Sequence, residues 1–315
     1  MKKLVLIAFA AASAATPAFS AAPPDLSGIF PDDVKTVGIV ALSSVIPAKT
    51  LAAGTNALVR AGYRLKVMPN VAERTVAPPE RRARLFEEAW LDPAVDLLLF
   101  ARGGHGAIDV VDKIDWEKLR TRDMRVIGFS DVTLVVNTML AKKVGHPYTG
   151  PMLSSLTKTR PGTIKRIHDM LAGTPQAVKL KALKPGAAAV KGLAMGGLLE
   201  RLHRLAERDM LPDPTGRVIF IENTFRYADQ ADGLLDGLVK KGMFAKAAAV
   251  VICDFNSKRP KEETAALLKR FADRIPCPVF TGFPYGHVGE SSLIDFRREL
   301  TIAADGTLSW RQGRQ

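Results

Sequence analysis

The feature that most constrains the fold of this chain is a regular alternation of short apolar runs with segments of helical periodicity. Four apolar runs lie between residues 36 and 129, and amphipathic stretches separate them. Apolar strands that alternate with helices are typical of a parallel sheet with helices on both faces. We therefore predict an α/β fold for this part of the chain. The predicted strands cover residues 36–42, 64–68, 95–101 and 124–129, and the predicted helices cover 48–61, 79–91 and 131–144.

The pattern changes near residue 160, and β-segments become more frequent beyond it. Two strand-like runs at the end of the chain flank Asp305-Gly306, which is a strong hairpin-turn signal. A length of 315 residues suits two domains. We expect an N-terminal domain over 35–170 and a smaller, β-rich α/β domain over 185–315. The predicted strands here are 174–183, 190–195, 217–222, 247–253, 299–304 and 307–311, and the helices are 198–208, 227–241 and 261–274.

The first residues have the features of a bacterial signal peptide. Two lysines precede an apolar run that is too short for a comfortable membrane span, and a small-x-small pattern follows it. We predict export to the periplasm without stable membrane insertion, and a membrane anchor is the alternative. The segments are Lys2-Lys3, the apolar run 4–15, Ala18-Phe19-Ser20 with cleavage near Ser20 or Ala22, the signal peptide 1–20 and a Pro-rich linker over 21–34.

Charge and cysteine content narrow the classes of partner. The formal net charge is +13, but no nucleic-acid-binding motif accompanies it, so we expect a solvated basic surface and no nucleic-acid partner. Cys253 and Cys277 are the two cysteines, and export would permit a disulfide between them. Whether that bridge forms stays open at this point. Two cysteines without a clustered histidine make no metal site, so no metal is expected.

A serine follows one of the predicted strands directly. In Gly128-Phe129-Ser130-Asp131 the apolar run ends and a helical pattern begins at once. Such a turn exposes a serine Oγ at the C-terminal edge of the sheet, beside a helix N-terminus. The usual nucleophile turn has a second glycine two residues after the serine, where this chain has Val132. The alternative is that Ser130 or Asp131 only caps the helix.

Three further segments have the residue types of an acyl-transfer site. Arg102-Gly103-Gly104-His105-Gly106 follows the third strand, and its backbone N–H groups could bind an oxyanion. Glu222 ends a strand, where a carboxylate is suited to orient a histidine. His287 lies in a loop with Pro284 and Gly286, and histidine is the usual general base. The alternatives are a flexible turn, a surface acid and a loop histidine without a catalytic role.

Taken together, these segments resemble the LD-carboxypeptidase family, which includes murein tetrapeptide carboxypeptidases and microcin C immunity peptidases. The markers are RGG-x-G, G-x-S-D, Gly196-Gly197, a strand that ends in Glu, and P-x-GH, and they occur here in that order over most of the chain from residue 37. The resemblance implies a flavodoxin-like N-terminal domain, a β-rich C-terminal domain, a homodimer and no cofactor. It also implies Ser130 as nucleophile, His287 as general base and Glu222 as the acid that orients it. The implied oxyanion hole combines the N–H of Asp131 with one from Gly103 or Gly104.

The resemblance implies hydrolysis of the terminal L–D bond of a murein tetrapeptide, with release of D-Ala. A carboxypeptidase must also bind the terminal carboxylate, and Arg102 is our candidate for that role. Leu198 stands where the family usually has Asn, and His105 where it commonly has Tyr, which leaves the identity of the peptide open. The alternatives are a peptidyl antibiotic as substrate, or a protein that binds wall peptides without cleaving them.

Overall fold

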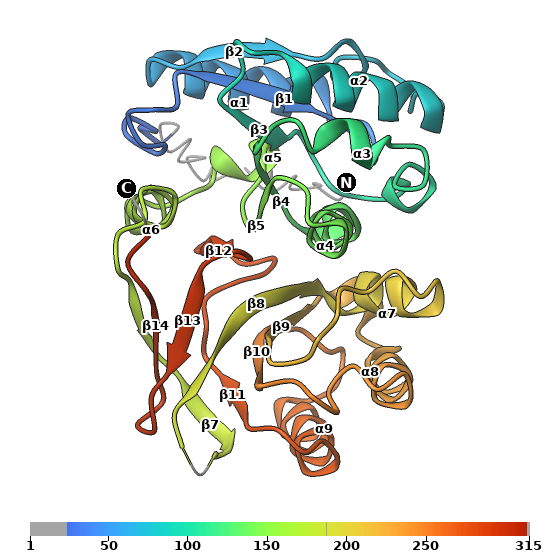
Figure 1. The fold of residues 1–315 in the computed structure, drawn as a ribbon, viewed down its shortest axis with the longest axis vertical. Helices are drawn as coiled ribbons and strands as arrows, with labels where there is room; N and C mark the ends of the chain where they lie inside the picture. Colours follow the sequence, from blue (N-terminus) through green and yellow to red (C-terminus); the bar gives the residue numbers. More distant parts are fainter. Residues whose placement is uncertain (1–23, 187, 314–315) are drawn as a thin grey trace, which may run out of the picture.

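The computed structural model describes residues 24–186 and 188–313, so the predicted signal peptide over 1–20 lies outside the described residues. Two sheets lie one above the other along the long axis of the molecule, each with its own helices (Figure 1). The α/β class and the parallel first sheet are confirmed. None of the helices in the described ranges is long and apolar enough to cross a membrane.

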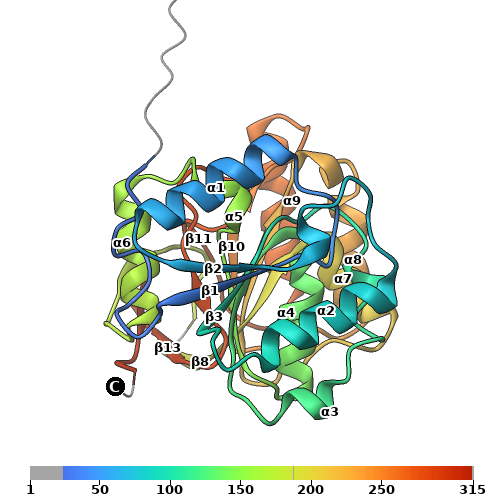
Figure 2. The ribbon, with the colours of Figure 1, turned by 90° about the horizontal axis from the view of Figure 1, so that it is seen from above.

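The first sheet has the strand order β12-β5-β4-β3-β1-β2. Its strands β1 to β5 are parallel, and their order 2-1-3-4-5 is that of the flavodoxin-like sheet. Figure 2 shows helix α1 on one face of this sheet and helices α2 and α4 on the other. The strands are β1 (Thr36–Val40), β2 (Arg64–Val67), β3 (Leu97–Phe100), β4 (Arg125–Gly128) and β5 (His146–Thr149). The helices are α1 (Ala48–Arg60), α2 (Pro79–Leu91), α3 (Trp116–Leu119), α4 (Thr133–Lys142), α5 (Leu153–Leu156) and α6 (Pro161–Leu171), with the 3-10 turns η1 (Pro69–Val71), η2 (Ala107–Asp109) and η3 (Ser130–Val132).

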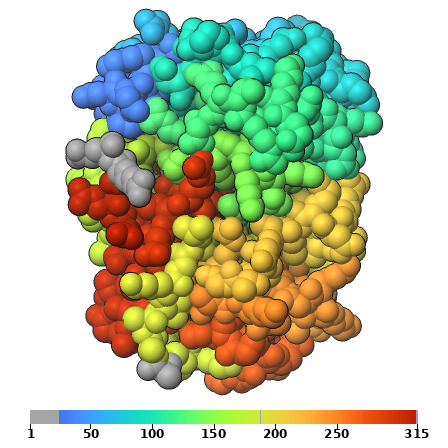
Figure 3. Space-filling model, in the orientation of Figure 1, coloured from blue at the N-terminus to red at the C-terminus, as the bar shows by residue number. Residues whose placement is uncertain are grey.

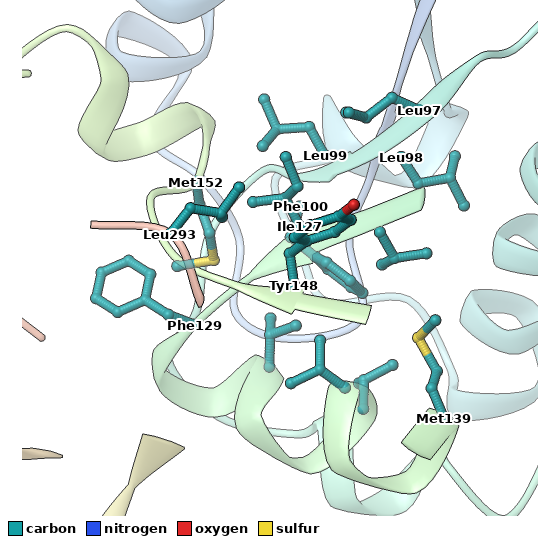
Figure 4. Packing of buried hydrophobic residues seen from close by; sticks show 14 of the residues in the cluster. Leu97, Leu98, Leu99, Phe100, Ile127, Phe129, Met139, Tyr148, Met152 and Leu293 are labelled. Atoms are coloured by element: carbon teal, nitrogen blue, oxygen red, sulfur yellow. The ribbon is translucent and has the colours of Figure 1, made fainter. Parts of the chain in front are cut away.

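Helices on both faces explain why the central strands are continuously apolar. Successive side chains of β3 point to opposite faces, yet all four are buried (Figure 4). Leu293, from the C-terminal part of the chain, packs beside Met152 in the same core (Figure 4). The hydrophobic core of the first sheet therefore includes residues from both ends of the sequence.

The second sheet has the order β6-β14-β13-β8-β9-β10-β11-β7, and its four central strands β8 to β11 are parallel. Helices α7, α8 and α9 lie along one side of it in Figure 1. The strands are β6 (Ala177–Lys179), β7 (Lys181–Lys184), β8 (Val190–Leu198), β9 (Val218–Asn223), β10 (Ala249–Phe255), β11 (Val279–Thr281), β13 (Glu299–Ile302) and β14 (Thr307–Trp310). The helices are α7 (Leu199–Glu207), α8 (Ala231–Lys240) and α9 (Lys261–Arg274), with the 3-10 turn η4 (Phe225–Tyr227).

The chain returns to the first sheet near its C-terminal end. Strand β12 (Ile294–Asp295) pairs antiparallel with β5, and the chain then re-enters the second sheet as β13. In Figure 3 the red C-terminal segment lies directly against the first domain. A division of the sequence near residue 170 therefore has one structural exception, because two residues of the second half complete the first sheet.

Two parts of the first domain differ from the sequence-based expectations. The stretch expected to be a linker is packed in its described part, because Leu26, Ile29 and Phe30 are buried and the Tyr63 hydroxyl accepts from the Phe30 N–H at 3.0 Å. Its apolar side chains pack against the hydrophobic core, so the described part of this stretch is not a free linker. Strand β5 was not predicted because it contains Pro147, and a proline argues against an interior strand.

Candidate active site

Ser130 lies at a strained turn between β4 and α4. Its φ is 63°, a left-handed conformation that non-glycine residues rarely adopt. The turn is held by tight packing beneath it, because a Cβ at Gly128 would lie 2.5 Å from Val132 Cγ1 and 2.8 Å from the Phe100 ring. Val132 thus fills the space under the turn in place of the second glycine. The result is a serine hydroxyl exposed at the C-terminal edge of the sheet.

His287 reaches Ser130 from a loop that connects the two sheets. The loop leaves β11 in the second sheet and ends at β12 in the first. The Tyr285 hydroxyl is 2.6 Å from Thr149 Oγ1 on β5, and both residues are buried. His287 Nε2 lies 3.1 Å from Ser130 Oγ, and its ring packs 4.9 Å from that of Phe129. The structure therefore brings together a predicted nucleophile and a predicted base that are 157 positions apart.

Glu222 lies behind His287 in the interior of the second domain. Strand β9 is buried along its whole length, and the exposed fraction of Glu222 is 0%. Glu222 Oε2 lies 3.0 Å from His287 Nδ1. Burial raises the pKa of the Glu222 carboxyl, and the hydrogen bond and charge of His287 act in the opposite direction. The three predicted residues form one chain of hydrogen bonds.

The surroundings of His287 favour its charged form. Partial burial lowers the pKa of its imidazole, but the hydrogen bond and charge of Glu222, together with the charge of Asp254, outweigh this effect and the pKa is raised. Gly286 allows the close approach, because a Cβ there would lie 2.9 Å from Asp254 Cβ and 3.2 Å from Glu222 Cβ. Asp254 was missed by sequence reasoning, because nothing in the β10 pattern distinguishes it from an ordinary strand-end acid.

The glycine turn after β3 lies against Ser130. A Cβ at Gly103 would lie 2.9 Å from Ser130 Cβ and 3.3 Å from the Asp131 nitrogen. Gly104 has a φ of 112°, and a Cβ there would lie 2.3 Å from Ser44 Oγ in the loop after β1. The loops after β1 and β3 adjoin at the point where the strand order reverses, which is where open α/β sheets bind ligands. The predicted oxyanion residues are therefore neighbours.

Asp131 does not cap its helix. Its carboxylate is buried and makes no capping hydrogen bond. Oδ2 accepts from the Ser43 hydroxyl at 2.7 Å and from the Ala107 N–H at 3.0 Å, while Oδ1 accepts from Arg201 Nε at 2.6 Å. The side chain thus fixes the loops after β1 and β3 to the turn that carries Ser130, so the helix-cap alternative is wrong for Asp131.

Arg201 connects this part of the first domain with the second domain and was missed by sequence reasoning. It lies on α7 with 2% of its side chain exposed. Besides Asp131, its guanidinium donates to the Gly104 carbonyl at 3.0 Å and lies 2.9 Å from His105 Nδ1, and it pairs with Glu200. Burial and the nearby arginine charges lower the pKa of His105. On the predicted helix 198–208 Arg201 lies outside the apolar stripe of Leu199, Leu202 and Leu205, so no local signal distinguished it.

These residues surround a cleft of about 450 Å³. Arg102 lines it with an exposed side chain and donates to the Val45 carbonyl at 2.8 Å. Arg226, from η4 of the second domain, also lines the cleft, and none of the described residues that line it carries a carboxylate. Leu198 is buried and contributes an apolar contact where the resembled family has an amide. The cleft is lined by Arg102, Gly103, Gly104, Phe129, Ser130, Met152, Ser154, Leu198, Arg201, Thr224, Phe225, Arg226, Tyr227 and His287.

The remaining reactive groups lie apart from this cleft. Cys253 on β10 and Cys277 before β11 are both free thiols, so the disulfide that the sequence left open is not formed. Burial raises the pKa of both thiols, which makes them poor nucleophiles. Within the described residues, no group of three or more His, Cys, Asp or Glu side chains could hold a metal ion.

Two family models match the chain. The LD-carboxypeptidase N-terminal domain matches residues 37–149 and the LD-carboxypeptidase C-terminal domain matches residues 191–302. The first match covers strands β1 to β5 and includes Ser130, and the second includes Glu222 and His287. Together the two matches cover more than two thirds of the chain.

Individual proteins agree with these matches. A probable murein peptide carboxypeptidase from Bacillus subtilis is 27% identical, over 82% of this chain and 86% of its own. The microcin C7 self-immunity protein of Escherichia coli is 21% identical, over 72% of this chain and 76% of its own. The crystal structure of a muramoyltetrapeptide carboxypeptidase from Oxalobacter formigenes superposes with a TM-score of 0.79 at 23% identity, and covers 88% of this chain and 98% of its own.

Proposed function

This chain belongs to the LD-carboxypeptidase family, and on that premise we propose that Ser130, Glu222 and His287 form a catalytic triad that releases D-Ala from a murein tetrapeptide. One observation carries the proposal. His287 Nε2 lies 3.1 Å from Ser130 Oγ while His287 Nδ1 lies 3.0 Å from the buried Glu222 carboxylate. A nucleophile, a base and an orienting acid in this order are the constellation that serine hydrolases use on several unrelated folds.

The proposed reaction follows from these contacts. His287 Nε2 accepts the Ser130 proton as Oγ attacks the scissile carbonyl carbon, and then gives that proton to the nitrogen of the leaving residue. The C–N bond breaks and an acyl-enzyme remains, which a water molecule hydrolyses with His287 again as base. Glu222 holds the imidazole in the required tautomer and stabilises its charged form.

The N–H groups of Asp131 and of Gly103 or Gly104 are the proposed oxyanion donors. A Cβ at Gly103 would lie 3.1 Å from Ser130 Oγ, so only glycine leaves room there for a tetrahedral oxygen. Each such donor typically contributes about 3 kcal/mol to transition-state stabilisation. The contacts of Asp131 and Arg201 keep both sides of this hole in a fixed geometry before the substrate arrives.

A murein peptide is the favoured substrate because such peptides carry several carboxylates. Arg102 and Arg226 line the cleft, no lining residue is acidic, and neither arginine forms an ion pair with a described residue. We propose that Arg102 contacts an anionic group of the peptide. Export with removal of residues 1–20, and assembly as a homodimer, are also part of the proposal. Amino-terminal sequencing of periplasmic protein and light scattering of the purified protein would test these two points.

One observation favours a second candidate substrate. The Phe225 side chain is 63% exposed at the cleft, next to Arg226. An exposed aromatic face suits a planar aromatic group, which a murein tetrapeptide lacks. A peptidyl antibiotic with an aromatic moiety would use the same triad and the same oxyanion donors.

The experiment that tests the proposal is D-Ala release from purified disaccharide-tetrapeptide and from free tetrapeptide. Wild-type protein would be compared with Ser130→Ala and with Ser309→Ala, a serine variant on β14 away from the cleft. We expect release by wild type and Ser309→Ala and its near-abolition in Ser130→Ala. Peptide binding without release in wild type would favour a binding protein, and cleavage of an aromatic peptidyl antibiotic alone would favour the second candidate.

A further inference from the structure

A second pocket adjoins the large cleft at His287. Its volume is about 310 Å³, and the two cavities share Phe129, Ser154 and His287. It lacks the glycines of the proposed oxyanion hole and is bounded by α5, the start of α6 and the loop that follows His287. Its lining residues are Phe129, Pro151, Ser154, Ser155, Lys158, Thr159, Thr163, Gly286, His287, Val288, Gly289 and Ser291.

The chemistry of acyl transfer decides which part of a peptide enters which cavity. His287 must return its proton to the nitrogen of the leaving residue, so that nitrogen has to lie within hydrogen-bond reach of the imidazole. The acyl carbonyl oxygen has to point toward Gly103 and Asp131, which adjoin the large cleft. A peptide that satisfies both conditions extends its acyl part along the large cleft and its leaving residue past His287 into the second pocket.

The charges around the second pocket match the end of a peptide chain. The residue released by a carboxypeptidase carries the free carboxylate, and among the described residues that line the pocket Lys158 is the one lysine or arginine. No ion pair or side-chain hydrogen bond joins Lys158 Nζ to the residues in 24–186 and 188–313. The nearby Glu290 is already paired with Arg160 at 2.9 Å and with Arg166 at 3.7 Å.

The other polar side chains near Lys158 are mostly engaged with the protein. Ser155 Oγ bonds the Met152 backbone, and Thr159 Oγ1 donates to the Ser155 carbonyl at 3.2 Å. Phe129 and the half-exposed Val288 offer apolar contacts to a small side chain. The pocket therefore combines one available ammonium group with an apolar wall, as a small amino acid with a free carboxylate requires.

We propose that this second pocket binds the leaving amino acid and that Lys158 binds its terminal carboxylate. The inference rests on the proposed carboxypeptidase function and deepens it. It assigns the terminal carboxylate to Lys158, and leaves Arg102 to an anionic group in the acyl part of the peptide.

The test compares tetrapeptide with a free terminal carboxylate and the same peptide with a terminal amide. We expect wild type to prefer the acid, and Lys158→Gln to lose about tenfold to a hundredfold in kcat/KM for the acid while changing little for the amide. Lys158→Arg should retain most of the preference, because it keeps the charge. Lys261→Gln, at the start of α9, is the matched control and should behave as wild type.

A binding measurement separates this inference from the proposed function. Calorimetry on Ser130→Ala, with and without Lys158→Gln, compares the affinity for acid and amide without any turnover. Acid preference in Ser130→Ala that disappears with Lys158→Gln supports the pocket, even if wild type releases no D-Ala and the proposed reaction fails. A preference for the acid that survives Lys158→Gln, or that is lost only in Arg102→Gln, overturns the assignment. The assignment also fails if none of the variants binds the acid more tightly than the amide.

Discussion

The two sides of the candidate active site are built in different ways. Ser130 lies in a turn that two consecutive elements of one domain define, and Val132 packs beneath it. His287 lies in a loop whose ends belong to different sheets, and its position depends on contacts with both. A nucleophile fixed by local structure and a base fixed by tertiary contacts respond differently to mutation. Substitutions at the domain interface should therefore affect the position of the base more than that of the serine.

The largest expected effect comes from removing the base itself. His287→Ala should lower kcat for D-Ala release by about 10⁴-fold or more, because Ser130 then has no proton acceptor. His287→Ala also leaves the fully buried Glu222 carboxylate without its hydrogen-bond partner, so the melting temperature should fall as well. D-Ala release in single-turnover conditions measures the loss of catalysis, and a melting curve measures the change in stability. A loss of less than tenfold would mean that His287 is not the general base.

The next effect concerns the contact that joins the serine turn to the second domain. Arg201→Met should destabilise the protein by about 3–5 kcal/mol, because it leaves the buried Asp131 carboxylate without its cationic partner and removes one of the two arginines that pair with Glu200. Urea unfolding measures this loss, and Arg201→Lys should recover part of it. Arg204→Met is the control, because this arginine on the same helix is 49% exposed and also pairs with Glu200 but does not contact Asp131. Equal stability of the two variants would contradict a structural role for Arg201.

A smaller effect is expected from one anchor of the His287 loop. Tyr285→Phe removes the hydrogen bond to Thr149 and should cost about 1–3 kcal/mol, because Thr149 is then buried without that partner. We expect kcat for D-Ala release to fall as well, since the base becomes less well positioned. Adding Thr149→Val should recover part of the stability, because both polar groups are then gone. Full kcat with reduced stability would show that this anchor does not position His287.

The smallest expected effect is a shift in pH dependence. The reaction needs neutral His287, and its pKa is raised above 6.5, so kcat/KM should rise with pH and its acid limb should have a midpoint above 6.5. Protonated His287 stabilises the folded protein at pH values below 6.5, and this contribution is lost as pH rises through the folded-state pKa. Asp254→Asn removes one of the charges that raise the pKa, so the acid limb should move to lower pH. A shift to higher pH would contradict this electrostatic role.

Local signals were sufficient for much of the fold. The predicted helices over 79–91 and 261–274 match the observed bounds of α2 and α9, because each has an apolar stripe and a proline at its start, Pro79 in the first turn of α2 and Pro260 at the N-cap of α9. Strand β5 and strand β12 escaped prediction. The first contains a proline, and the second is two residues long and exists only because it meets β5.

The candidate site was predictable only in part, because several of its contacts join segments that are far apart in the sequence. The glycine near Ser130, and the proline and glycines near His287, lie within single short segments, so these two site residues could be predicted from local sequence. The role of Asp131 is different, because its partners Ser43 and Arg201 lie 88 and 70 positions away and no local pattern connects them. Asp254 likewise influences His287 only because Gly286 allows the two segments to approach.

The sequence by itself therefore determined most of the segments that become strands and helices, where the chain turns sharply and which residue types are available at those turns. Short-range periodicity and backbone preferences act within a few residues, so they can be read along the chain. Only the tertiary structure decided that Ser130, Glu222 and His287 meet, that Arg201 is buried against Asp131, and that a second pocket opens beside His287. These outcomes depend on how two sheets pack and on how the chain returns from one to the other. Packing depends on surfaces that many distant residues form together.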